Sequence, residues 1–103
     1  MKAIKFEGRR VEEIEIDNTL EALQAAVDGY IETVPIRHIP TDKAVMIVNE
    51  EGLLRGMSHN PAATMIAGTK IVGSAIVVGV DGEEFTDIPE DTKQFIRSTL
   101  MLT

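Results

Sequence analysis

The sequence predicts an α+β fold, in which a small mixed, mostly antiparallel sheet packs against two or three helices. Three observations predict it. Short segments with alternating or continuous apolar residues are typical of strands, and they occur along the whole chain. Other segments carry the residues that begin and end helices. No linker, repeat or low-complexity tract separates these elements, so residues 1–103 are expected to form one α+β domain.

The first predicted element is a β-hairpin. Residues 2–6 alternate and place Ile4 and Phe6 on one face of a strand. Gly8 follows in a turn, and residues 13–16 alternate again. The two strands are therefore expected to pair with each other.

A helix is predicted next, over residues 19–28. Asn18 is followed by Glu21 three positions later, a spacing typical of a capping box with Asn18 as the N-cap. Gly29 provides a natural end. The expected buried face consists of Leu20, Leu23 and Val27.

The middle of the chain predicts two or three strands. Residues 30–36 form the first, and Pro35 places its end at a sheet edge because proline cannot donate to a ladder. Residues 44–48 are wholly apolar, which is typical of a central strand buried on both faces. A turn at Gly52 then lets residues 53–57 pair back as a hairpin partner.

A short helix and a strand are predicted after this turn. Asn60 followed by Pro61 is typical of an N-cap with proline at the first helical position, and Gly68 ends the helix. Residues 70–80 resemble a strand that is interrupted by Gly73, which fits a bulge or a close approach of backbone.

The last predicted element is a C-terminal helix over residues 89–102, after a turn at Asp81 and Gly82. Acidic residues at its start and Lys93 and Arg97 further on agree with the helix dipole. The expected buried face consists of Phe95, Ile96 and Leu100.

Charge and composition exclude several function classes. Ten basic and seventeen acidic residues give a net charge of -7, which argues against direct nucleic-acid binding. Cysteine is absent, so disulfides and thiolate metal sites are excluded. The longest apolar run, residues 75–78, is too short to cross a membrane, and the N-terminus lacks the apolar region of a signal peptide. A cytoplasmic protein is therefore expected.

No cofactor, metal site or catalytic residue is expected. His38 and His59 have no second ligand at helical spacing, which argues against zinc. Gly68, Gly73 and Gly79 do not form a known phosphate-binding motif. These residues are interpreted as ordinary surface histidines and turn or bulge glycines.

One polar stretch, residues 49–61 with the sequence NEEGLLRGMSHNP, holds the candidate ligand-binding residues. Amides and a guanidinium can recognise an anion or a base edge without overall positive charge. The candidates are Asn49, Arg55, His59 and Asn60. The alternative interpretation is architectural: a solvated turn at Glu50 and Glu51 that leads into a helix start.

Motifs along nearly the whole chain resemble a family of small proteins from tailed phages and bacterial mobile elements, known as domain of unknown function 3846. The similar segments are residues 16–24, 29–32, 49–52, 60, 71–79 and 81–85. One departure lies at residues 62–70, where relatives often have a longer acidic insertion. The resemblance implies an accessory protein in the cytoplasm of a bacterial host. It assigns no reaction and therefore no catalytic residue.

Three function classes remain open at this stage. The first is a non-enzymatic binding protein that holds a small polar or nucleotide-like ligand, with a homo-oligomer and a counter-defence role as further expectations. The second is an acidic inhibitor or adaptor that binds a host protein. The third, ranked last, is a small hydrolase using His59 with Glu50 or Glu51.

Overall fold

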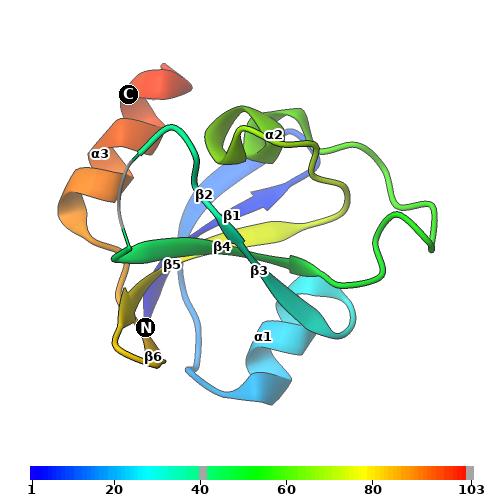
Figure 1. The fold of residues 1–103 in the computed structure, drawn as a ribbon, viewed down its shortest axis with the longest axis horizontal. Coiled ribbons are helices and arrows are strands. Elements are labelled where there is room, and N and C mark those ends of the chain that lie inside the picture. Colours follow the sequence, from blue (N-terminus) through cyan, green and yellow to red (C-terminus); the bar gives the residue numbers. More distant parts are fainter. Residues whose placement is uncertain (40–41, 102–103) are drawn as a thin grey trace.

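The computed structural model describes residues 1–39 and 42–101 and confirms the α+β class (Figure 1). Its elements are β1 (Lys2–Glu7), β2 (Arg10–Glu15), α1 (Leu20–Val27), β3 (Ile31–Pro35), β4 (Ala44–Asn49), α2 (Pro61–Ala67), β5 (Ala75–Asp81), β6 (Glu84–Thr86) and α3 (Glu90–Thr99). The strands form one sheet in the order β2-β1-β5-β4-β3, and β6 pairs with β5. Each pairing is antiparallel.

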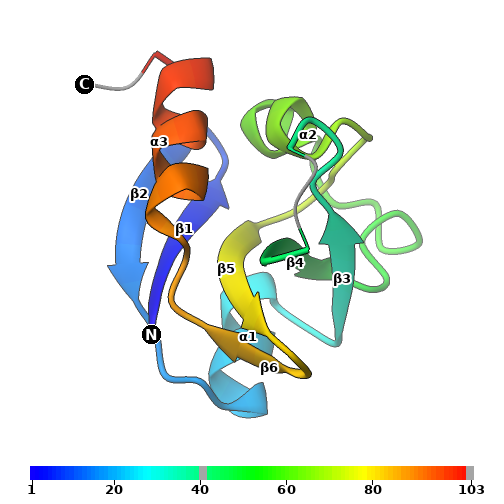
Figure 2. The same ribbon diagram turned by 60° about the vertical axis from the view of Figure 1, so that its left-hand side comes forward.

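The central strands β4 and β5 are buried on both faces of the sheet. Their successive side chains point to opposite sides and enter two separate cores. Met46 and Val77 belong to a core shared with α2 and α3, whereas Ile47 and Ile76 belong to a core shared with α1. Figures 1 and 2 show α1 on one side of the sheet and the other two helices on the opposite side. The prediction of a central strand at residues 44–48 is confirmed.

The predicted first helix exists, but its N-cap is Thr19 rather than Asn18. The Thr19 hydroxyl accepts a hydrogen bond from the Ala22 backbone N–H at 3.1 Å. Asn18 instead donates to the Phe85 carbonyl at 2.8 Å, so a tertiary contact removes its side chain from the cap. Leu20 is 57% exposed, contrary to the prediction, whereas the other two residues of the predicted face are buried.

The segment 53–57 is not a strand, so that prediction is wrong. Residues 50–56 form turns, and the Met57 N–H donates to the Gly52 carbonyl at 3.0 Å, which closes a compact loop. Gly56 has φ +66, a left-handed conformation that suits glycine and diverts the chain from an extended path. The pairing occurs later instead, where His59 forms a β-bridge with Val72.

The short second helix begins and ends as predicted. Asn60 is its N-cap and Gly68 follows it with φ +79. The predicted strand over residues 70–80 is shorter than expected, since regular pairing begins only at Ala75. Gly73 has φ +74 before it, which agrees with the predicted interruption. β6 was not predicted, because its three residues have too little pattern to identify a strand.

α3 confirms the predicted C-terminal helix as far as Thr99, and Leu102 lies outside the described residues. Ile96 is fully buried, and Phe95 and Leu100 pack against the same core. On the solvent side, Glu13 of β2 pairs with Lys93 and Arg97 of α3. In the ranges that the structure describes, no helix combines the length and apolar character needed to cross a bilayer.

Gly79 allows the chain to cross over β5 on its way to α3. A Cβ at this position would overlap the backbone carbonyl of Asp87. We therefore expect Gly79→Ala to lower the free energy of unfolding by about 1–3 kcal/mol through overpacking. Urea denaturation followed by circular dichroism measures this change. If Gly79 were an ordinary strand glycine, alanine would instead stabilise the protein by about 0.4–1 kcal/mol, and that sign would contradict the account.

Candidate functional site

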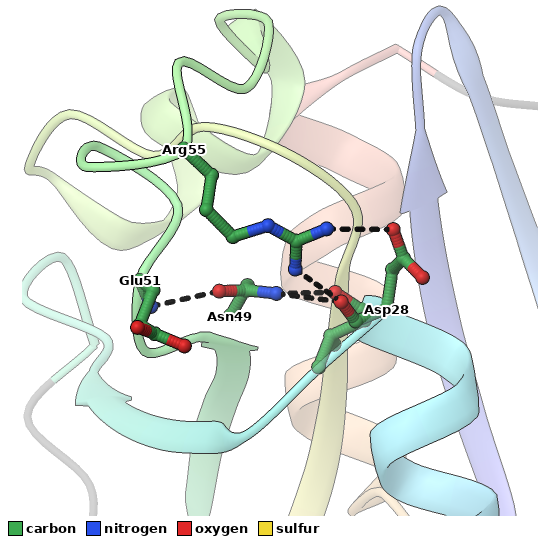
Figure 3. Close-up of polar contacts among 5 residues, drawn as sticks. Asp28, Asn49, Glu51 and Arg55 are labelled. Carbon is green, nitrogen blue, oxygen red and sulfur yellow. Dashed lines mark hydrogen bonds and ion pairs between the residues drawn. The ribbon is translucent and has the colours of Figure 1, made fainter.

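Asn49 ends β4 and connects it to the last turn of α1. Its side chain is buried, and its Nδ2 donates to the carbonyl oxygens of Val27 and Asp28, both at 3.0 Å (Figure 3). Its Oδ1 accepts from the Glu51 backbone N–H at 2.7 Å. Both ends of the amide are therefore occupied by backbone groups, and the bonds fix the start of the 50–56 loop relative to α1.

Arg55 returns from that loop to the same helix end. Its Nη1 donates to the Asp28 carbonyl at 2.6 Å, and its Nη2 lies 3.4 Å from the Asp28 carboxylate. A cation beside the last carbonyls of a helix is favoured by the helix dipole. Gly29 leaves room for this arrangement, since a Cβ there would lie 2.7 Å from Asn49 Nδ2 and 3.1 Å from Arg55 Nη1. We call Asp28, Gly29, Asn49 and Arg55 the α1 cap.

Asn60 has a comparable role at the start of α2. It is only 2% exposed, and its Oδ1 accepts from the Ala63 N–H at 3.2 Å. Its Nδ2 donates to the carbonyls of Phe6 at 3.1 Å and Gly73 at 2.8 Å. One side chain thus caps a helix and joins it to β1 and to the segment before β5.

His59 is exposed, and its Nε2 lies 3.2 Å from the Thr64 hydroxyl. The four candidate residues therefore lie in two separate networks. Asn49 and Arg55 meet at the end of α1, whereas His59 and Asn60 lie at the start of α2. In residues 1–39 and 42–101, the hydrogen bonds above give the two networks no common partner.

A surface groove of about 560 Å³ lies between these networks, bordered by β3, β4 and two loop segments. Val48 and Ile71, which line it, are core residues of the sheet face that carries α2. The groove therefore opens on that face, beside β3. Its lining residues are 32–35, 48–50, 52–54 and 69–72. We call this feature the β3 groove.

Exposed leucines and a few charges give the β3 groove its chemistry. Leu53 is 72% exposed and Leu54 is 89% exposed, both in the closed 50–56 loop. Glu32 and Glu50 contribute carboxylates, and Lys70 contributes an ammonium group. This combination suits non-covalent binding to a partly apolar surface.

Only one of the four candidate residues, Asn49, lines the groove, and its amide is bonded to α1. Sequence reasoning missed Leu53 and Leu54 because it placed them in a strand. The sequence does contain a signal for them: two adjacent leucines lie between Gly52 and Gly56, and a short polar turn gives apolar side chains little opportunity to reach the core.

Of the residues named in the hydrolase hypothesis, Glu50 lines the groove and His59 does not. No group of three metal-ligating side chains occurs within the described ranges.

Comparison with known proteins identifies the family. The chain belongs to the family described as domain of unknown function (DUF3846), whose model matches residues 1–100. The resemblance noted in the sequence is thereby confirmed. No curated protein and no solved structure matches the chain.

The α1 cap gives a stability prediction that separates a structural amide from a ligand-binding one. Asn49→Ala removes three hydrogen bonds, including the buried bond to the Val27 carbonyl, whereas the Asp28 carbonyl keeps its bond from Arg55. We expect it to lower the free energy of unfolding by about 2–3 kcal/mol in chemical denaturation. Arg55→Ala, at a half-exposed side chain, is the matched comparison and should lower it by less than about 1 kcal/mol. Equal stability of Asn49→Ala and the unmodified protein would show that this amide is free for another role.

Proposed function

We propose that this member of the DUF3846 family is a non-enzymatic binding protein that attaches to another protein through the β3 groove. The observation that carries the proposal is the pair of exposed leucines, Leu53 and Leu54, on the wall of a groove that runs beside a sheet edge. The resemblance to phage and mobile-element proteins supports an accessory role, such as counter-defence, in the cytoplasm of a bacterial host.

The loop that carries the leucines is held in place before any partner arrives. Its base is closed by the Gly52–Met57 hydrogen bond, and its start is fixed to α1 through Asn49. A loop that is already ordered loses less conformational entropy on binding. Burial of an exposed leucine contributes about 1.5–3 kcal/mol, which is enough for this pair to form the energetic centre of an interface.

The charges favour a protein over a small anion. Glu32 and Glu50 line the groove together with Lys70, so a nucleotide phosphate would meet two carboxylates and one ammonium group. The amides of Asn49 and Asn60, which the ligand hypothesis needs, are bonded to backbone groups. The groove therefore favours a protein partner over a small polar or nucleotide-like ligand.

The net charge of -7 supports the role of an acidic inhibitor or adaptor. A strongly acidic protein is attracted over long range to a partner with a basic surface, which raises the rate of association. A host protein with a basic nucleic-acid groove has that property. No catalytic step is required for such a protein to act, since occupation of the partner's surface is sufficient.

Paired leucine variants test this function. The partner is first isolated from host lysate by cross-linking to the full chain, then purified, and its affinity is measured by calorimetry. Leu54→Asp should weaken binding at least tenfold, about 1.4 kcal/mol, because it places a charge in the apolar contact. Leu20→Asp is the matched control, since Leu20 is also exposed but lies outside the groove, and it should leave the affinity unchanged.

Equal losses in both variants would contradict a role for the groove. A nucleotide panel provides the complementary test. A rise in melting temperature with a nucleotide, abolished by Lys70→Ala, would replace the protein partner by the small-ligand hypothesis.

A further inference from the structure

We propose that the partner binds by strand addition, as an extended segment that lies along the free side of β3. This inference rests on the proposed function and names the chemistry of the segment: one cationic and one apolar side chain, two residues apart, on the side that faces the β3 groove. Strand addition takes its affinity from main-chain hydrogen bonds and its specificity from alternate side chains.

β3 is the end strand of the sheet, and Figure 2 shows it at the margin opposite to β1 and β2. Within residues 1–39 and 42–101, no further strand pairs with its outer side. The Glu50 N–H donates to the Tyr30 carbonyl at 2.8 Å, which makes these two residues a hydrogen-bonded pair. In an antiparallel ladder such pairs alternate with pairs whose backbone groups point outward.

The register of β3 with β4 then shows, for each residue of β3, whether its backbone N–H and C=O groups point toward β4 or away from the sheet. Glu32 and Val34 are the residues bonded to β4, opposite Val48 and Met46. The backbone N–H and C=O groups at positions 31 and 33, and the carbonyl at position 35, therefore point away from the sheet. Pro35 agrees with this phase, because a proline at an outward position removes no bond within the ladder. Two outward donors remain, on Ile31 and Thr33.

The two edges of the sheet differ in charge. β2, the opposite edge, has the sequence RVEEIE, with four charged residues out of six. Its Glu13 is also paired with two cations of α3. Charged side chains on an edge strand discourage the addition of another strand. β3 has the sequence IETVP with one charged residue, so this edge lacks the same protection.

The position of that one charge specifies the added segment. Val34 packs against the core on the α2 face, and Glu32 shares its side of the strand. Residues of an added strand opposite these two would also point to the α2 face, where the groove opens. A cation opposite Glu32 forms a cross-strand ion pair, and an apolar residue two positions away reaches the wall of Leu53 and Leu54.

Charge complementarity also selects between a partner and a second copy of this chain. Two copies paired through β3 would each bring a carboxylate to the same edge and a net charge of -7 to the same assembly. Like charges oppose that association. A cationic segment of another protein is attracted by the same groups, and it is the occupant that we assign.

The test uses the full chain and a fluorescent, end-blocked heptapeptide with the order threonine, valine, leucine, valine, lysine, valine, threonine. Added antiparallel to β3, it places its leucine opposite Val34, its central valine opposite Thr33 and its lysine opposite Glu32. Its lysine and leucine lie on one side, and the N–H groups of its valines face β3. Fluorescence anisotropy is expected to show binding. Methylation of the central valine nitrogen should weaken it about tenfold or more, since a main-chain bond is lost, whereas methylation of the lysine nitrogen should not. Glutamate in place of lysine should also weaken binding, because it brings a like charge opposite Glu32.

Two proline variants provide the matched pair on the protein. Thr33→Pro removes an outward N–H from β3 without changing the charge, and Pro35 shows that this phase tolerates proline. Glu15→Pro places proline in β2, also at an outward position, because the Ile16 N–H bonds to the Met1 carbonyl and fixes the phase there. Only Thr33→Pro should weaken peptide binding, by about tenfold or more. Circular dichroism and melting temperature confirm that both variants fold.

The outcomes separate this inference from the proposed function. Strand addition is overturned if the heptapeptide fails to bind, or if methylation of the central valine and Thr33→Pro both leave its affinity unchanged. If the isolated partner still loses affinity with Leu54→Asp in that case, the groove function stands without strand addition. If light scattering shows a dimer of the chain alone that Thr33→Pro converts to a monomer, the occupant is a second copy and our assignment is wrong.

Discussion

Burial of β4 and β5 on both faces is the constraint on which the rest of the structure depends. Ten of their thirteen residues are buried, so each face of the sheet must be covered by helices. α1 covers one face, and α2 and α3 cover the other. The sheet can then expose its backbone only at the outer sides of its end strands β2 and β3 and of the short strand β6. β2 is charged and joined to α3, and β6 has only three residues, one of which bonds to Asn18 through its carbonyl. β3 is therefore the most accessible edge.

Two buried asparagines connect this core to its surface. Asn49 and Asn60 lie at either end of the same polar stretch, and each uses its amide to join backbone segments that are distant in sequence. Between them the chain forms the closed loop that presents Leu53 and Leu54. The two asparagines of the stretch thus serve the architecture, whereas its two leucines face solvent. This reverses the usual pattern, in which polar side chains face solvent and leucines are buried.

Local sequence patterns were sufficient to predict much of the fold. The hairpin, the central strand, the edge position of Pro35 and the Asn60 cap are all determined by residues within a few positions of one another. The patterns failed where a distant group decides the outcome. Asn18 bonds to the Phe85 carbonyl rather than capping α1, and the loop after Gly52 is set by its contact with the segment near Val72. The hydrogen-bond partners of the candidate residues Asn49 and Asn60 were inaccessible to sequence patterns for the same reason, since they lie far away in sequence.

Residue-resolved amide hydrogen exchange tests most directly whether the outer side of β3 is the available edge of the sheet. In the free protein, the N–H groups of Glu32 and Val34 should exchange slowly because they bond to β4, whereas those of Ile31 and Thr33 should exchange fast. When the partner is bound, Ile31 and Thr33 should become protected. Slow exchange at Thr33 in the free protein, or no change on binding, would contradict the account.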